Sequence, residues 1–153
     1  MSSEQTNGHR IVVGVDGSSS SRAALAWAVR QAGLTGASVE AVIAWHYPVM
    51  AGGVPFVPIG PLDNFDYGEW AASVLNDAIN QTVDPDGPVK VSTTVQQGNP
   101  AAVLLGAAVG AELLVVGSRG HGGFAEALLG SVGQACVHHA RCPVVVVRGA
   151  KAG

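Results

Sequence analysis

The chain has 153 residues, the length of one domain, and 48% of them are hydrophobic, which excludes a disordered protein and allows a core without disulfides or metals. Its net charge of −3 and its eight lysines and arginines, spread from Arg10 to Lys151, argue against a large nucleic-acid-binding surface. Glycine is in excess, at 21 of 153 residues, but without the three-residue period of collagen.

The first nine residues are polar and lack the apolar stretch of a secretory signal. No apolar run approaches the roughly 18 residues of a membrane span. We therefore expect a disordered tail over residues 1–9, a single domain over residues 10–149, and a cytoplasmic protein that contacts no membrane. The two cysteines, Cys136 and Cys142, are compatible with a reducing compartment.

Short β-branched runs then alternate with longer amphipathic stretches, a pattern typical of βαβ units and a parallel sheet. The first strand is predicted at residues 11–15, followed by a serine-rich turn and a helix to about residue 34. A second strand is predicted at residues 39–47. Residues 48–68 contain four prolines and four glycines among apolar side chains, and they favour a lid, a partner surface or a structural loop.

The helical pattern returns from residue 69 to about residue 83, and residues 89–95 alternate as a third strand at a sheet edge. Asn99 and Pro100 start a third helix that runs to about residue 109. A fourth strand at residues 113–116, a helix at residues 130–139 and a strand at residues 143–148 complete the chain. Five strands alternating with four helices predict a doubly wound, three-layer α/β/α sandwich.

Two predicted loops follow the carboxyl ends of strands, and folds of this kind bind their ligands outside those ends. The loop at residues 14–18 carries Asp16, whose carboxylate can accept hydrogen bonds from a ribose or hold a metal that bridges phosphates. The loop at residues 117–123 contains four glycines, so its N–H groups and the following helix N-terminus can bind phosphate. Neither loop matches the P-loop or the dinucleotide pattern G-x-G-x-x-G.

The spacing Gly117-x2-Gly120-x9-Gly130-Ser131 matches the glycine signature of the nucleotide-binding branch of the universal stress protein family. The first predicted strand and Asp16 also resemble that family, and the resemblance covers about residues 10–148. It implies an ATP-binding, Rossmann-like fold of the adenine nucleotide alpha hydrolase-like type. It further implies a five-stranded sheet of order 3-2-1-4-5 and a homodimer through the last strand.

The resemblance also implies the site residues. Asp16 meets the ribose or the metal–phosphate region, with Gly14 beside it and Mg²⁺ held only indirectly through the phosphates, and Ala44 offers backbone groups to the adenine. The other implied residues cradle phosphates and ribose or close the site, and they are Gly117, Arg119, Gly120, Gly122, Gly123, Gly130, Ser131 and Val132. Ser131 would both cap the last helix and donate to a phosphate.

Each assignment has a simpler alternative. The glycine loop can be a connection without a ligand, and Asp16 can cap the first helix or shape an Asx-turn. Arg119 can be a solvated charge, His121 an exposed loop side chain and His46 a packing residue. Near the end of the chain, four residues of types that can bind metals do not reproduce the spacing of a zinc site; they are Cys136, His138, His139 and Cys142.

We therefore expect an adenine-nucleotide-binding stress-response protein in which ATP acts as a regulatory ligand. The alternatives are a protein that binds AMP or cyclic AMP, a weak ATPase, and a protein-interaction domain with an empty site. Any ATP hydrolysis should be slow, because no general base and no set of metal ligands accompanies Asp16. The apolar strand from Pro143 to Val147 would be exposed at a sheet edge, and pairing in a homodimer would cover it.

Overall fold

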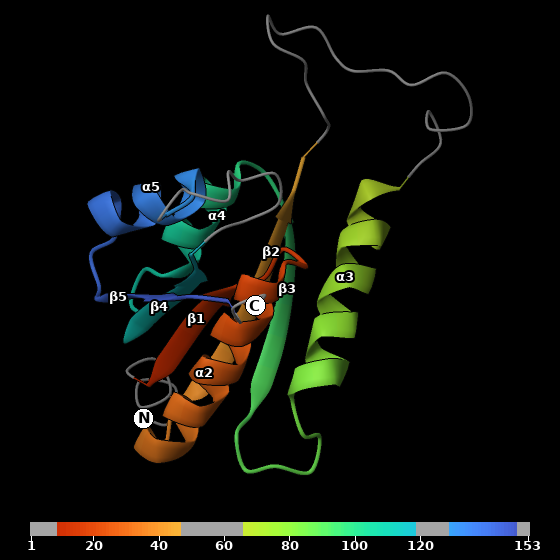
Figure 1. The fold of residues 1–153 in the computed structure, drawn as a ribbon, viewed down its shortest axis with the longest axis vertical. Coiled ribbons are helices and arrows are strands. Elements are labelled where there is room, and N and C mark those ends of the chain that lie inside the picture. Colours follow the sequence, from red (N-terminus) through yellow and green to blue (C-terminus); the bar gives the residue numbers. More distant parts are fainter. Residues whose placement is uncertain (1–8, 47–65, 119–128, 150–153) are drawn as a thin grey trace, which may run out of the picture.

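The computed structural model describes residues 9–46, 66–118 and 129–149. Within them a five-stranded parallel sheet is covered by two helices on each face (Figure 1). The strands lie in the order β3-β2-β1-β4-β5, which confirms the expected order 3-2-1-4-5. Their bounds are Arg10–Gly14 for β1, Ser38–Trp45 for β2, Val91–Gln97 for β3, Leu113–Gly117 for β4 and Val144–Val147 for β5.

The helices alternate with these strands along the chain, as predicted. They are α2 at Ser19–Thr35, α3 at Tyr67–Thr82, α4 at Pro100–Ala107 and α5 at Ser131–His139. Helices α2 and α3 pack on one face of the sheet, and α4 and α5 pack on the other. No helix in the described part of the chain combines the length and the apolar character needed to cross a membrane.

The central strand β1 is apolar because both faces of the sheet are covered there. Ile11 and Val13 of β1 point into the core under α2 and α3, whereas Val12 points into the core under α4 and α5. All three side chains are fully buried. This two-sided burial explains why the strand is a continuous apolar run without polar alternation.

Several predicted boundaries were wrong by about two residues. Strand β3 begins at Val91 and ends at Gln97, two residues later than expected, because its ends follow its parallel pairing with β2 from Val39 to Trp45. Helix α3 begins at Tyr67, capped by Asp66, inside the stretch expected to be a loop. Residues 48–65 of that stretch, residue 47 at the end of the predicted second strand and residues 1–8 of the expected tail lie outside the described residues.

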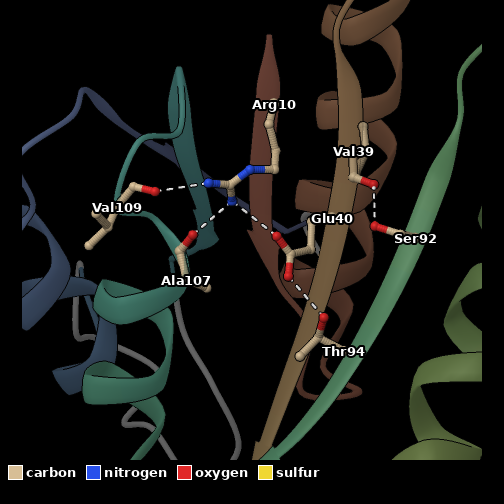
Figure 2. Close-up of polar contacts among 7 residues, drawn as sticks. All are labelled: Arg10, Val39, Glu40, Ser92, Thr94, Ala107 and Val109. Carbon is tan, nitrogen blue, oxygen red and sulfur yellow. Dashed lines mark hydrogen bonds and ion pairs between the residues drawn. The ribbon is translucent and has the colours of Figure 1, made fainter. Parts of the chain in front are cut away.

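A polar network joins the amino-terminal ends of β1 and β2 to the end of α4 (Figure 2). Arg10 Nη1 donates to Glu40 Oε1 at 3.0 Å and to the carbonyl oxygen of Ala107 at 2.8 Å. Its Nη2 donates to the carbonyl oxygen of Val109 at 2.9 Å, and Thr94 Oγ1 donates to Glu40 Oε2 at 2.8 Å. The network therefore holds the carboxyl end of α4 against the sheet. The amino-terminal end of α4 lies near the carboxyl ends of the strands.

Candidate functional site

A cleft of about 740 Å³ lies at the carboxyl ends of β1, β2 and β4. Strand β1 has β2 on one side and β4 on the other. The order in which successive strands are added to the sheet therefore reverses at β1. Doubly wound folds bind their ligands at such a position. The cleft also falls within the usual size of ligand pockets, about 300–1,000 Å³.

The structure brings together the predicted site residues that it describes. The lining of the cleft includes Gly14, Asp16, Ala44, Gly117, Gly130, Ser131 and Val132. The remaining predicted residues lie outside the described part of the chain, and they are Arg119, Gly120, Gly122 and Gly123, together with His121. Residues more than 100 positions apart in the sequence thus meet in one cleft, as the two-loop interpretation requires.

Asp16 lies half-buried in the cleft wall and is held by the turn before α2. Its Oδ1 accepts hydrogen bonds from the backbone N–H of Ser18 at 2.9 Å and from Ser18 Oγ at 2.6 Å. This is an Asx-turn, one of the two simpler roles considered for Asp16. The helix cap is Ser18, whose Oγ accepts from the N–H of Ser21 at 3.2 Å. Asp16 therefore shapes the turn and also faces the cleft.

The chemistry near Asp16 suits a cation only in part. Within the described residues, no three His, Cys, Asp or Glu side chains are grouped so that they could hold a metal ion. Asp16 is the only carboxylate among the described lining residues. Mg²⁺ prefers six oxygen ligands, so an ion here would take most of them from phosphate groups and water.

The amino terminus of α5 differs from those of the other described helices. Side chains of Ser18, Asp66 and Asn99 cap α2, α3 and α4. At α5 the cap residue is Gly130, which supplies no side-chain hydrogen bond. Ser131 is the first helical residue, so the expectation that Ser131 caps this helix was wrong. The backbone of Gly130 is extended, with φ −71° and ψ 173°, much as at Ser18, the cap of α2, with φ −75° and ψ 161°.

This uncapped end of α5 presents backbone donors to the cleft. The first hydrogen bond within the helix runs from the N–H of Gln134 to the carbonyl oxygen of Gly130, at 2.9 Å. The N–H groups of Ser131, Val132 and Gly133 therefore have no acceptor within α5. All three residues line the cleft. Their dipoles create a partial positive charge that favours an anionic group.

Hydrogen bonds of Ser118 connect the end of β4 to the end of β5 and to the start of α5. The N–H of Ser118 donates to the carbonyl oxygen of Val147 at 2.8 Å, and the N–H of Gly130 donates to the carbonyl oxygen of Ser118 at 2.7 Å. The second bond places Gly130 beside the strand end although eleven residues separate it from Ser118. The spacing of the glycine signature therefore corresponds to a closed loop whose two ends are joined.

Two glycines of the site are also packing residues, which sequence reasoning missed. A Cβ atom on Gly117 would lie 2.5 Å from Ser20 Oγ and 2.7 Å from the carbonyl carbon of Ser20. A Cβ atom on Gly14 would lie 2.7 Å from Leu104 Cδ1. The first turn of α2 and the side chain of Leu104 approach these strand ends so closely that only glycine fits without a shift.

The opposite wall of the cleft is aromatic. It combines Trp45 and His46, at the end of β2, with Tyr67 and Trp70, in the first turn of α3. Of these, only His46 was a candidate from the sequence. The available signal was the cluster of aromatic residues on both sides of residues 48–65: Trp45 and His46 lie in the predicted second strand, Tyr67 in the predicted loop and Trp70 in the predicted helix.

A model of the universal stress protein family matches residues 8–148, nearly the whole chain. The chain belongs to the universal stress protein family. A universal stress protein of Mycolicibacterium smegmatis is 36% identical to it over 138 residues, which cover 90% of this chain and 45% of that relative. The chain thus spans less than half the length of this curated relative.

Solved universal stress proteins share the fold. UspA from Lactobacillus plantarum is 25% identical, with a TM-score of 0.71, and the match covers 92% of this chain and 98% of that one. A universal stress protein solved in complex with cAMP is 26% identical, with a TM-score of 0.58, and the match covers 93% and 98%. The three-layer sandwich described above is therefore the fold of this family.

The two cysteines of this universal stress protein lie away from the cleft lining, in the core between the sheet, α4 and α5. Both are free thiols in the structure. Burial raises the pKa of Cys136 to about 11, and the nearby Cys142 adds to this shift. A thiol with so high a pKa is protonated and unreactive at neutral pH, so Cys136 serves as a small core side chain.

Proposed function

We propose that this universal stress protein is a cytoplasmic protein that binds an adenine nucleotide, ATP in the first place, in the cleft at the carboxyl ends of the strands. Binding would regulate its exposed loops or its association with a second copy. The observation that carries the proposal is the uncapped amino terminus of α5, which lines the same cleft as Asp16. The cAMP complex of a relative that is 26% identical supports an adenine nucleotide as the ligand class.

The two ends of the cleft suit the two ends of a nucleotide. Phosphate oxygens would accept hydrogen bonds from the N–H groups of Ser131, Val132 and Gly133, and from the glycine loop before them. Asp16 would accept from ribose hydroxyls. Ala44, at the end of β2, would offer backbone groups to the adenine. Backbone dipoles can thus bind phosphate in a chain whose net charge is −3.

Binding without efficient turnover agrees with the composition of the cleft. Among its described lining residues only Asp16, His46 and Tyr67 carry titratable side chains. ATP hydrolysis needs a group that orients water and metal ligands that neutralise the developing charge. We therefore propose that any hydrolysis of ATP is slow. Cyclic AMP is the second candidate ligand, favoured by the bound ligand of the relative named above.

The α5 terminus offers a test that separates backbone donors from side-chain donors. Ser131→Pro removes the N–H and the hydroxyl at the first helical position, where proline is well tolerated. The extended backbone of Gly130 suits a residue that precedes proline. Ser131→Ala removes the hydroxyl alone and is the matched control.

Isothermal titration of both variants and the wild type with ATP, AMP and cyclic AMP would measure the effect. We expect Ser131→Pro to bind its preferred nucleotide at least tenfold more weakly than Ser131→Ala, because a hydrogen bond to a charged phosphate contributes about 1.5–3 kcal/mol. Mass spectrometry of nucleotide released on heating would identify the natural ligand. A wild-type protein that binds none of the three nucleotides would contradict the proposed function.

We also propose a homodimer formed through β5. This strand is the edge of the sheet next to β4, and its Val146 is 36% exposed. Val137 of the neighbouring α5 is 48% exposed. Antiparallel pairing with a second copy would cover both the free backbone groups of the edge and these apolar side chains.

A further inference from the structure

The aromatic wall, defined as Trp45, His46, Tyr67 and Trp70, faces the part of the cleft beside Ala44. Its two indoles differ in exposure. Trp45 is partly buried and packs against the core under α2 and α3. Trp70 is 48% exposed although it lines the cleft. Trp70 is therefore the more exposed of the two indoles in this wall.

Local packing holds Trp70 in place. A Cβ atom on Gly68 would lie 3.4 Å from Cε2 and Cζ2 of Trp45, so the Trp45 ring lies against the backbone of the first turn of α3. Asp66 caps this turn, because its Oδ1 accepts from the N–H of Glu69 at 2.9 Å. Its carbonyl oxygen accepts from the N–H of Trp70 at 3.0 Å. Asp66 and the ring of Trp45 thus hold the backbone of the first turn of α3, which carries Trp70.

The chemistry of the cleft changes from one side to the other. Backbone N–H groups of α5 line one side, whereas aromatic rings and the aliphatic side chain of Ile43 line the side toward β2 and α3. A planar, weakly polar ring is the ligand group that suits aromatic and aliphatic neighbours. Any nucleobase can stack on the face of an indole, because every base has a π-face.

We propose that Trp70 is the residue on which the nucleobase of the bound nucleotide stacks. This inference rests on the proposed nucleotide binding and adds the side chain that holds the base. It assigns the phosphate end of the ligand to α5 and the base end to α3. The two ends of the site would thus belong to helices on opposite faces of the sheet, so the ligand would bridge the two layers.

The test combines affinity with tryptophan fluorescence. The chain has three tryptophans, and Trp27 lies on α2 and is not among the cleft-lining residues. Trp70→Ala should bind ATP, AMP and cyclic AMP at least fivefold more weakly than the wild type, because it removes the stacking surface. Trp70→Phe keeps an aromatic ring and should bind within about twofold of the wild type. Glu69→Ala, at an exposed neighbour that is not among the lining residues, is the matched control and should bind as the wild type does.

Ligand-dependent quenching supplies a readout that a merely structural role would not move. In the double variant Trp27→Phe/Trp45→Phe the only tryptophan left is Trp70, and nucleotide should quench its fluorescence. Equal affinity of Trp70→Ala and the wild type, or a double variant that binds nucleotide without quenching, would overturn the assignment of Trp70 while leaving nucleotide binding intact. A wild type that binds no nucleotide would overturn the proposed function itself. Should Trp70→Ala fail to fold, the quenching in the double variant decides.

Discussion

Gly117 is conspicuous in the sequence as the first glycine of a phosphate-binding signature, but its immediate role in the structure is packing. The carbonyl carbon of Ser20 and the N–H nitrogen of Ser21 would lie 2.7 and 2.8 Å from a Cβ atom at this position. These are backbone atoms of the first turn of α2, which cannot move aside as a flexible side chain can. A substitution at Gly117 therefore disturbs the fold before it disturbs a ligand.

Two glycine-to-alanine substitutions test this interpretation. Gly117→Ala should lower the free energy of unfolding by about 1–3 kcal/mol, the usual cost of overpacking. Gly106→Ala, in α4 with no atom within 4 Å of the added Cβ, should raise it by up to about 1 kcal/mol, because alanine has less backbone entropy to lose. Urea unfolding of both variants measures the difference. A Gly117→Ala protein as stable as the wild type would show that α2 yields at this contact.

Helix α4 illustrates how an element is positioned from both ends. Asn99 caps its start by accepting from the N–H of Ala102 at 3.1 Å, and Pro100 occupies its first turn. At its other end Arg10 donates to the carbonyl oxygen of Ala107, the last residue of α4, and to that of Val109, two residues beyond the helix. The side chain of Leu104 between these ends packs beside Gly14 in the cleft wall. The position of α4 therefore influences the shape of the cleft.

The coupling between Arg10 and Glu40 can be measured with a double-mutant cycle. Their side chains are 24% and 21% exposed, so the pair is partly shielded from water. Arg10→Met should destabilise the protein by about 1–3 kcal/mol, because it leaves Glu40 and two carbonyl oxygens without this donor. The double variant Arg10→Met/Glu40→Gln should cost less than the sum of the two single variants. Strict additivity in chemical denaturation would mean that the pair does not interact.

At the scale of the whole molecule, the described sheet has two open edges, β3 and β5. They expose comparable apolar side chains, since Val95 of β3 is 38% exposed and Val146 of β5 is 36% exposed. The proposed homodimer uses β5, where Val137 of α5 extends the apolar surface. Strand β3 carries more polar residues, among them Ser92, which favours an edge that remains in water.

A lysine at each edge distinguishes the two. Val146→Lys should shift the protein from dimer to monomer in sedimentation velocity at micromolar concentration, because two positive charges would face each other across the paired strands. Val95→Lys makes the same chemical change on the other edge and should leave the dimer intact. A monomeric wild type would refute the homodimer, and dissociation by Val95→Lys alone would move the interface to β3.

The parts of the fold that the sequence predicted correctly are those that depend on neighbours along the chain. The apolar run around Val13 indicated a strand buried on both faces, and Asn99 with Pro100 indicated a helix start. Boundaries set by pairing were missed, as at β3, because the register with β2 joins residues about fifty positions apart. The cap of α5 was assigned to Ser131 because serine is the better capping side chain, whereas the closed loop places Gly130 in the extended cap conformation.

By itself the sequence determined the alternation of strands and helices, the glycine-rich loop and the turn that carries Asp16, since periodicity and turn chemistry are local properties. The order of the strands followed from the family resemblance. Only the tertiary structure decided that Gly117 packs on Ser20, that the amino terminus of α5 lines the cleft uncapped, and that Trp70 lines its other wall. These contacts join residues from distant parts of the chain, and their geometry exists only once the sheet has assembled.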